Sequence, residues 1–233
     1  MTTIAERLQA VQASIHKAVT NAGRLTEHIA LIAVSKAQPA ANIRTAFNQG
    51  QRLFGENYLQ EALDKQAQLS DLNIEWHFIG PIQSNKTQQT AQHFAWVHGI
   101  DRLKIAQRLN DARPDHLPPL QVCIQVNVSE EESKSGVPTH EVESLVSAIK
   151  NLPRLKLRGL MAIPAPTTDI ALQHQQFAIV RTLYQQLNAE GYRLDTLSMG
   201  MSDDFAIAIA EGATMIRIGT AIFGARQAKS SNE

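Results

Sequence analysis

The sequence predicts a single α/β domain in which eight strand–helix units close into one (β/α)8 TIM barrel, preceded by an extra N-terminal helix. Short apolar runs alternate regularly with longer amphipathic segments, which favours parallel strands. The connections are short, and no linker, repeat or low-complexity stretch divides the 233 residues. Eight units in fewer than about 250 residues are typical of a closed barrel, and an open doubly wound sheet is the alternative.

An amphipathic helix is expected before the first strand. Thr3 and Glu6 have the spacing of a capping box. Apolar residues recur at helical spacing from Ile4 to Val19, which predicts one buried stripe. The helix is expected to end near Gly23, because glycine commonly follows the last helical turn.

The later elements follow from the same alternation, with glycine and proline at their boundaries. The expected strands cover 29–36, 52–55, 75–80, 96–100, 120–128, 155–163, 194–199 and 214–219. The expected helices cover 39–49, 57–69, 84–94, 102–112, 141–152, 170–190 and 203–211, with a polar loop at 129–139 and a helical turn after 220. We expect the barrel to span 1–228 and a polar tail to occupy 229–233.

Composition excludes several functional classes. The 22 basic and 22 acidic residues cancel, so nothing indicates a surface for nucleic acid or an anionic membrane. No stretch is long and apolar enough to span a bilayer, and the 8 histidines lack metal-ligand spacing. Because charges and glutamines interrupt residues 1–23, we expect no signal peptide there. The single cysteine, Cys123, lies in an apolar run, which excludes an intrachain disulfide and indicates a reducing cytoplasm.

The first expected strand ends in Lys36, at the end of the barrel where active sites of this fold lie. A lysine that is removed from water loses its proton readily and becomes a nucleophile for carbonyl groups. The functional interpretation is therefore a Schiff-base lysine. The alternative is a lysine that reaches water at the strand exit.

A phosphate site is expected in the loops after the last two strands, which commonly bind phosphate in this fold. The loop that begins at Ser198 supplies Gly200 for close backbone approach and Ser202 as a hydroxyl donor. Gly219 and Thr220 begin the turn after the last strand. Ordinary helix capping by Ser202 and Thr220 is the alternative.

Strand alternation turns Arg217 into the barrel, because Ile216 and Ile218 then face the helices. A buried arginine needs an acceptor. The pyridine nitrogen of pyridoxal phosphate (PLP) is one such acceptor, and a permanently protonated arginine would leave that nitrogen neutral and weaken the cofactor as an electron sink. A buried ion pair, for instance with Glu56, is the alternative.

Lysine, phosphate loops and arginine together predict a PLP site. Three further strand-end residues are candidates for contacting the cofactor ring. Asn57 would lie near the ring hydroxyl, His77 near the ring and Met161 against a ring face. A helix cap for Asn57 and core packing for His77 and Met161 are the structural alternatives.

Eight motifs closely resemble the pyridoxal phosphate homeostasis protein family. They occur in the same order, at 33–36, 54–58, 76–80, 83–86, 133–136, 159–164, 197–204 and 217–224. The resemblance covers the chain from the first helix to about Arg226, with no departure at a functional position. This family is similar to the barrel domain of alanine racemase, which implies the type III fold of PLP proteins without the second β domain.

The resemblance also implies roles for individual residues. Lys36 carries the cofactor, Arg217 faces the pyridine nitrogen, and Ser202, Gly219 and Thr220 hold the phosphate. The implied function is a PLP carrier or buffer without robust catalysis of its own, with apo forms of PLP-dependent enzymes as expected clients.

An amino-acid racemase is the alternative function. A two-base racemase needs an acid/base group opposite the lysine, and in alanine racemase this group comes from a second domain of a partner subunit. Such a domain is not expected here, because the chain stops soon after the last strand. A class I aldolase also uses a barrel lysine, but an intrinsic visible chromophore would argue against it.

Two further expectations concern binding. Because the site does not require a partner chain, we expect a monomer. Lys134, in the loop from Glu130 to Gly136, is a candidate second docking point for the cofactor, and a solvated acidic loop is the alternative.

Overall fold

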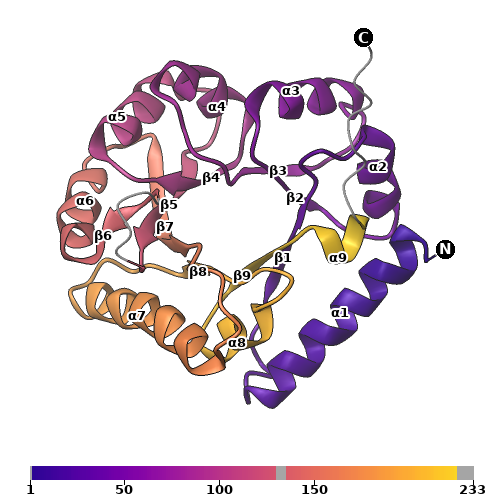
Figure 1. The fold of residues 1–233 in the computed structure, drawn as a ribbon. Helices are drawn as coiled ribbons and strands as arrows, with labels where there is room; N and C mark the ends of the chain where they lie inside the picture. The colour runs from indigo at the N-terminus through magenta and orange to yellow at the C-terminus, as the bar shows by residue number, and fades with distance from the viewer. Residues whose placement is uncertain (1, 130–134, 225–233) are drawn as a thin grey trace, which may run out of the picture.

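The computed structural model describes residues 2–129 and 135–224, in which strands and helices alternate (Figure 1). The strands are β1 (Ala30–Val34), β2 (Leu53–Glu56), β3 (Glu75–Phe78), β4 (Trp96–Ile100), β5 (Leu120–Asn127), β6 (Val137–Pro138), β7 (Leu155–Ala162), β8 (Thr196–Ser198) and β9 (Met215–Ile218). The helices are α1 (Ile4–Asn21), α2 (Ala40–Asn48), α3 (Leu59–Gln68), α4 (Thr87–His93), α5 (Leu103–Ala112), α6 (Val142–Ile149), α7 (Ile170–Ala189), α8 (Phe205–Ala210) and α9 (Thr220–Phe223). Lys134 and the expected tail 229–233 lie outside the described residues.

The strands form one parallel sheet that closes on itself. Their order is β4-β3-β2-β1-β9-β8-β7-β5-β6, and a further pairing of β4 with β5 completes the barrel. Figure 1 shows the helices as an outer ring around the strands. The predicted (β/α)8 barrel is therefore confirmed.

The two-residue strand β6 was not expected, because the sequence there reads as a polar loop. On one edge of β5, the pairing with β4 reaches only Ile124. β7 occupies the other edge as far as Val126. Beyond Ile124, β5 therefore has no partner from β4 on that edge. β6 takes this place: Val137 pairs with Val126 and is buried.

Within the described residues, β9 is followed by the four-residue helix α9 alone, and the N-terminal helix α1 takes the place of an eighth outer helix. The predicted capping box of Thr3 and Glu6 is present at its start. The helix lies against α2, α8 and α9 (Figure 1). Arg7 Nε also donates to Ile222 O in α9 at 2.7 Å. The first helix thus covers the strands at both chain ends.

Strand pairing brings the two ends of the chain together at the site. β1 pairs with β9, with Ile32 opposite Arg217 and Ala33 opposite Ile218. Lys36 and Gly219 follow these strands, so they leave the barrel side by side. The N-terminal lysine and the C-terminal arginine become neighbours although the sequence separates them widely.

Inside and outside faces follow the predicted alternation. Ile216 and Ile218 belong to the large core between the sheet and the helices. A second, smaller cluster fills the barrel interior: Ile32, Trp96, Cys123, Met161 and Met215. Among the described residues, no helix has the length and apolar character to cross a membrane, and no group of histidine, cysteine and acidic side chains is arranged to hold a metal ion.

Candidate functional site

A pocket of about 230 Å³ opens at the C-terminal ends of the barrel strands. Six of the ten residues predicted for the cofactor line it: Lys36, Asn57, Ser202, Arg217, Gly219 and Thr220. Five lining residues were not predicted: Val34, Ile79, Ile163, Met201 and Asp203. The structure thus gathers the lysine, the arginine and both predicted phosphate loops around one cavity.

Lys36 is half-buried, and its two neighbours are fixed by side chains of α3. Lys65 Nζ donates to Ser35 O at 2.7 Å. Ala37 N donates to Glu61 Oε1 at 2.6 Å. Ala37 has a φ of 59°, in the left-handed region that non-glycine residues seldom occupy. These contacts hold the turn that carries Lys36, so its backbone position is set before any ligand arrives.

The side chains that hold Ser35 and Ala37 belong to an ion cluster in which Glu56 and Lys65 are buried and Glu61 is partly exposed. Lys65 Nζ lies 2.8 Å from Glu56 Oε1 and 2.5 Å from Glu61 Oε1. Burial raises the pKa of Glu56 despite these favourable charges, and Glu61 adds to the increase. Glu56 therefore pairs with Lys65, and the alternative interpretation of Arg217 as its partner is wrong.

Arg217 is buried beneath the pocket and is held by three oxygen atoms. Nη1 donates to Ser198 O at 2.6 Å and to Ser198 Oγ at 2.8 Å, and Nη2 donates to Ala162 O at 2.9 Å. Burial lowers the pKa of Arg217 to about 10, so the guanidinium keeps its charge at neutral pH. A fixed cation that donates hydrogen bonds therefore lies at the floor of the pocket.

The two predicted phosphate loops meet beside Lys36. A Cβ atom at Gly219 would lie 3.1 Å from Val34 O, so only glycine fits without displacing β1. Ser202 is half-buried and Thr220 is exposed, and both line the pocket. The exposed carboxylate of Asp203 lies at the rim of the same pocket. This side of the cavity combines hydroxyl groups with a closely approaching backbone.

Asn57 contributes an unsatisfied acceptor. Its Oδ1 atom is buried and has no hydrogen-bond partner among the residues of 2–129 and 135–224. A buried acceptor without a partner costs free energy. A hydroxyl or amine group of a ligand in this pocket would remove that cost.

Four predicted residues do not line the pocket: His77, Met161, Ser198 and Gly200. His77 and Met161 lie in the barrel interior, two positions before the lining residues Ile79 and Ile163, which directly follow the same strands. Side chains two positions apart on a strand point to the same face. His77 and Met161 therefore point into the barrel as predicted, but they lie deeper in it than the pocket. Ile79 and Ile163 could therefore be predicted from the same alternation, read two positions further along each strand.

Ser198 and Gly200 act on the site indirectly. Ser198 is fully buried and accepts from Arg217. Gly200 has a φ of 98°, and a Cβ atom there would lie 2.7 Å from Ala208 Cβ. Gly200 thus shapes the loop against α8, and its position gives it no contact with the pocket.

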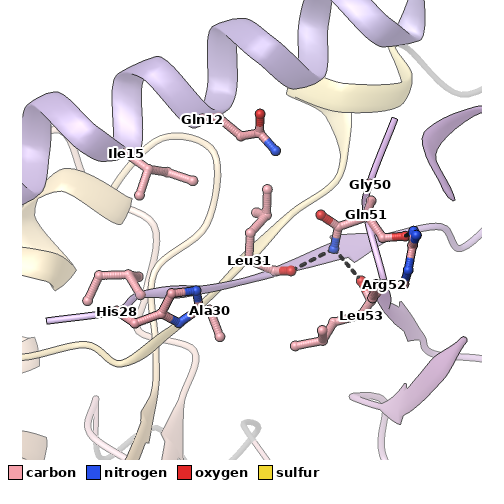
Figure 2. Close-up of a pocket in the computed structure, with 10 residues that line it drawn as sticks. Gln12, Ile15, His28, Ala30, Leu31, Gly50, Gln51, Arg52 and Leu53 are labelled. Atoms are coloured by element: carbon pink, nitrogen blue, oxygen red, sulfur yellow. Dashed lines mark hydrogen bonds between the residues drawn. The ribbon is translucent and has the colours of Figure 1, made fainter. Parts of the chain in front are cut away.

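Another hollow, of about 340 Å³, lies at the opposite end of the barrel (Figure 2). Gln12 and Ile15 of α1 lie over it, and Gln51 bridges its floor by donating to Leu31 O and Leu53 O, each at 2.7 Å. These bonds join the N-terminal ends of β1 and β2. The hollow is a structural gap far from Lys36, since parallel strands place all their C-terminal ends on the other side.

Comparison with known families and sequences gives one consistent result. The family model "Alanine racemase, N-terminal domain" matches residues 7–227. A curated relative from Pseudomonas aeruginosa, named pyridoxal phosphate homeostasis protein, is 60% identical over 97% of this chain and 97% of its own length. A relative from Escherichia coli (strain K12) with the same name is 52% identical over 97% of this chain and 98% of its own length.

Solved structures agree with this result. PipY of Synechococcus elongatus, determined with PLP bound, has a TM-score of 0.85 and 38% identity, covering 95% of this chain and 100% of its own. Alanine racemase from Corynebacterium glutamicum has a TM-score of 0.65 and 20% identity, covering 93% of this chain and 63% of its own. At that identity the second match shows the shared barrel alone.

Proposed function

Because this chain belongs to the pyridoxal phosphate homeostasis protein family, we propose that it binds pyridoxal 5'-phosphate and acts in PLP homeostasis as a carrier or buffer. The observation that carries the proposal is the meeting of Lys36, Arg217 and the loops of Ser202 and Gly219 around one pocket. PLP offers an aldehyde, a ring nitrogen and a phosphate. Each of these groups has a chemical counterpart in the pocket.

The described residues fit the cofactor. Lys36 supplies an amine for a covalent link to the aldehyde, and Arg217 supplies donors for the ring nitrogen. The unsatisfied Oδ1 atom of Asn57 suits a hydroxyl group on the ring. Ser202 and Thr220 supply hydroxyl groups for the phosphate, with Gly219 allowing close approach. When bound, the cofactor supplies an electrophilic aldehyde, and the protein supplies the amine that holds it.

We also propose that the protein has no robust catalytic activity of its own. Arg217 stays protonated and leaves the ring nitrogen without a proton, which weakens the cofactor as an electron sink. Among the described residues that line the pocket, Asp203 is the one carboxylate, and it is exposed to water. Racemisation requires a second acid/base group that faces the lysine across the ring. Sustained amino-acid turnover by the wild type that disappears in Lys36→Ala would overturn the carrier proposal.

The finer aspects of partnership and location are proposals as well. The expected monomer, the apo-enzyme clients, the cytoplasmic location and a second docking point at Lys134 stay predictions. Size-exclusion chromatography coupled to light scattering tests the expected monomer. Direct transfer of PLP from this protein to an apo enzyme tests the expected clients.

The proposed cofactor is tested by spectroscopy and mass mapping of the purified wild type. With PLP the protein should absorb visible light, and borohydride should bleach it and leave a phosphopyridoxyl mass on the peptide that contains Lys36. A protein that stays colourless and unmodified after PLP is added would contradict PLP binding.

Ser202→Ala is expected to weaken PLP binding about tenfold and to leave binding of pyridoxal, which lacks the phosphate, unchanged. The lost interaction is one hydrogen bond to a charged group, worth about 1.5 kcal/mol. Equilibrium titration followed by visible absorbance measures both ligands. Ser14→Ala, on the outer helix α1, is the matched control. Equal weakening for PLP and pyridoxal would place Ser202 away from the phosphate.

A further inference from the structure

Four hydrogen bonds connect Glu75 to Arg217 through the interior of the barrel. Glu75 Oε1 lies 2.9 Å from His77 Nε2, and His77 Nδ1 lies 2.9 Å from His98 Nε2. His98 Nδ1 lies 2.9 Å from Ser198 Oγ, which lies 2.8 Å from Arg217 Nη1. The side chain of Glu75 is 44% exposed, whereas both histidines and Ser198 are 0% exposed. This chain of hydrogen bonds therefore runs from water, at the N-terminal end of β3, to the floor of the cofactor pocket.

The two ends of this chain fix the proton on every bond. An ionised carboxylate only accepts and a guanidinium only donates. From Glu75 inward, His77 Nε2–H donates to the carboxylate, and His77 Nδ1 accepts from His98 Nε2–H. His98 Nδ1 then accepts the Ser198 O–H, and a lone pair of Ser198 Oγ accepts from Arg217. Each bond holds one proton, provided that both imidazoles are neutral with the proton on Nε2.

The surroundings favour neutral imidazoles. Burial lowers the pKa of His77, against the opposing effect of Glu75. Burial lowers the pKa of His98 well below its ordinary value, and the neighbouring imidazole of His77 and the charge of Arg217 add to the decrease. The ring of Trp96 stacks on both, with centroids 5.4 Å from His77 and 5.7 Å from His98. The rings are thus confined in position and uncharged at neutral pH.

We propose that Glu75, His77, His98 and Ser198 are positioning residues that fix the orientation of the Arg217 guanidinium toward the ring nitrogen of the cofactor. The inference rests on the proposed function. The other acceptors of Arg217 are backbone oxygens of Ser198 and Ala162, which carry no charge. The chain adds aligned dipoles that end in a carboxylate, and such polarised networks strengthen each member in a low-dielectric interior.

The first test needs no cofactor. Long-range ¹H–¹⁵N NMR of the ¹⁵N-labelled protein reports which nitrogen of each imidazole carries a proton. His77 and His98 should both show a protonated Nε2 and an unprotonated Nδ1 at neutral pH. A proton on Nδ1 of either ring would overturn the proposed polarity of the chain, whatever the protein binds.

The second test compares His98→Leu with His98→Gln, because glutamine can accept from Ser198 and donate to His77 whereas leucine can do neither. His98→Leu is expected to release PLP about three- to tenfold faster, the range of one net hydrogen bond, and to shift the visible absorption maximum. His98→Gln should restore values near the wild type. Equal spectra and release rates in wild type, His98→Leu and His98→Gln would refute the positioning role.

Glu75→Ala provides a second variant at the exposed end if His98→Leu does not fold, with Glu75→Gln as its matched control. Glu75→Ala removes the terminal acceptor, whereas Glu75→Gln keeps an acceptor oxygen. Glu75→Ala should change the cofactor spectrum more than Glu75→Gln, and identical spectra would count against the proposal. A wild type that binds no PLP would defeat the proposed function instead, and the NMR experiment would still decide the proton arrangement.

Discussion

Lys36→Ala is expected to abolish the visible chromophore and all borohydride-stable labelling of the peptide that spans β1. The reason is chemical, because alanine has no amine to bond the aldehyde of the cofactor. The remaining pocket still contains Arg217 and the two loops predicted to bind phosphate. A weak, reversible affinity for PLP should therefore persist. Visible absorbance after gel filtration measures the loss, and intact mass after borohydride confirms it.

Lys17→Ala, on the exposed face of α1, is the control for this experiment. It should retain colour, label and affinity at wild-type levels. If Lys36→Ala captured PLP covalently with unchanged stoichiometry, the amine would have to come from another lysine, and the assignment of Lys36 would be lost. Peptide mapping of the same sample would identify that lysine.

The order of strands and helices was predictable because it depends on local patterns. Each strand is a short apolar run and each helix has an amphipathic stripe, so the alternation is visible in sequence. Closure of the barrel then follows from the number of units, and closure makes β1 a neighbour of β9. The convergence of Lys36 and Arg217 could be inferred for this reason, although 181 positions separate them in the chain.

The depth at which a side chain lies in the barrel was less predictable than the face of the sheet to which it points. His77 and Met161 point into the barrel as alternation requires, yet Ile79 and Ile163 are the residues at the pocket. The point at which a strand emerges from the barrel depends on its stagger against its neighbours. That stagger is a tertiary property, since it is fixed by the shear of the closed sheet.

Contacts between polar side chains that are distant in the sequence could not be predicted from the sequence. Nothing local indicates that Lys65 of α3 reaches Ser35 O beyond β1, or that His98 of β4 meets Ser198 of β8. Such pairs form across the interior of the barrel or between the strands and the outer helices. Their partners can be named only when the relative rotation of the elements is known. For this reason the sequence leaves Glu56 open as a partner of Arg217.

Lys65→Met is expected to lower the free energy of unfolding by about 3–5 kcal/mol, the usual cost of removing one partner from a buried ion pair. Glu56 is 0% exposed, and its Oε2 atom has no hydrogen-bond partner within the described residues. Loss of Lys65 would leave two carboxylates facing each other without a cation. Urea denaturation followed by circular dichroism measures the change.

The double variant Glu56→Gln/Lys65→Met separates charge from packing. It removes the buried charge together with its partner, so it should recover a large part of the stability lost in Lys65→Met. A double variant as unstable as Lys65→Met would show that the loss came from packing of the lysine stem or from the tether to Ser35 O.

The pH dependence of Lys65→Met provides an independent check of the same cause. Burial already raises the folded-state pKa of Glu56 above its ordinary value of 4.5, and loss of the lysine removes the charge that opposes this increase. A group with a raised folded pKa stabilises the protein below its unfolded pKa, and this contribution is lost as pH rises through the folded pKa. The destabilisation relative to wild type should therefore grow over the range in which the pH rises from 4.5, the ordinary pKa of this carboxyl group, through its raised folded-state pKa. A difference that is constant over this range would exclude an unpaired Glu56 as its origin. A simultaneous loss of PLP labelling at Lys36 would link the buried cluster to the position of the lysine, because Lys65 and Glu61 hold the residues on either side of it.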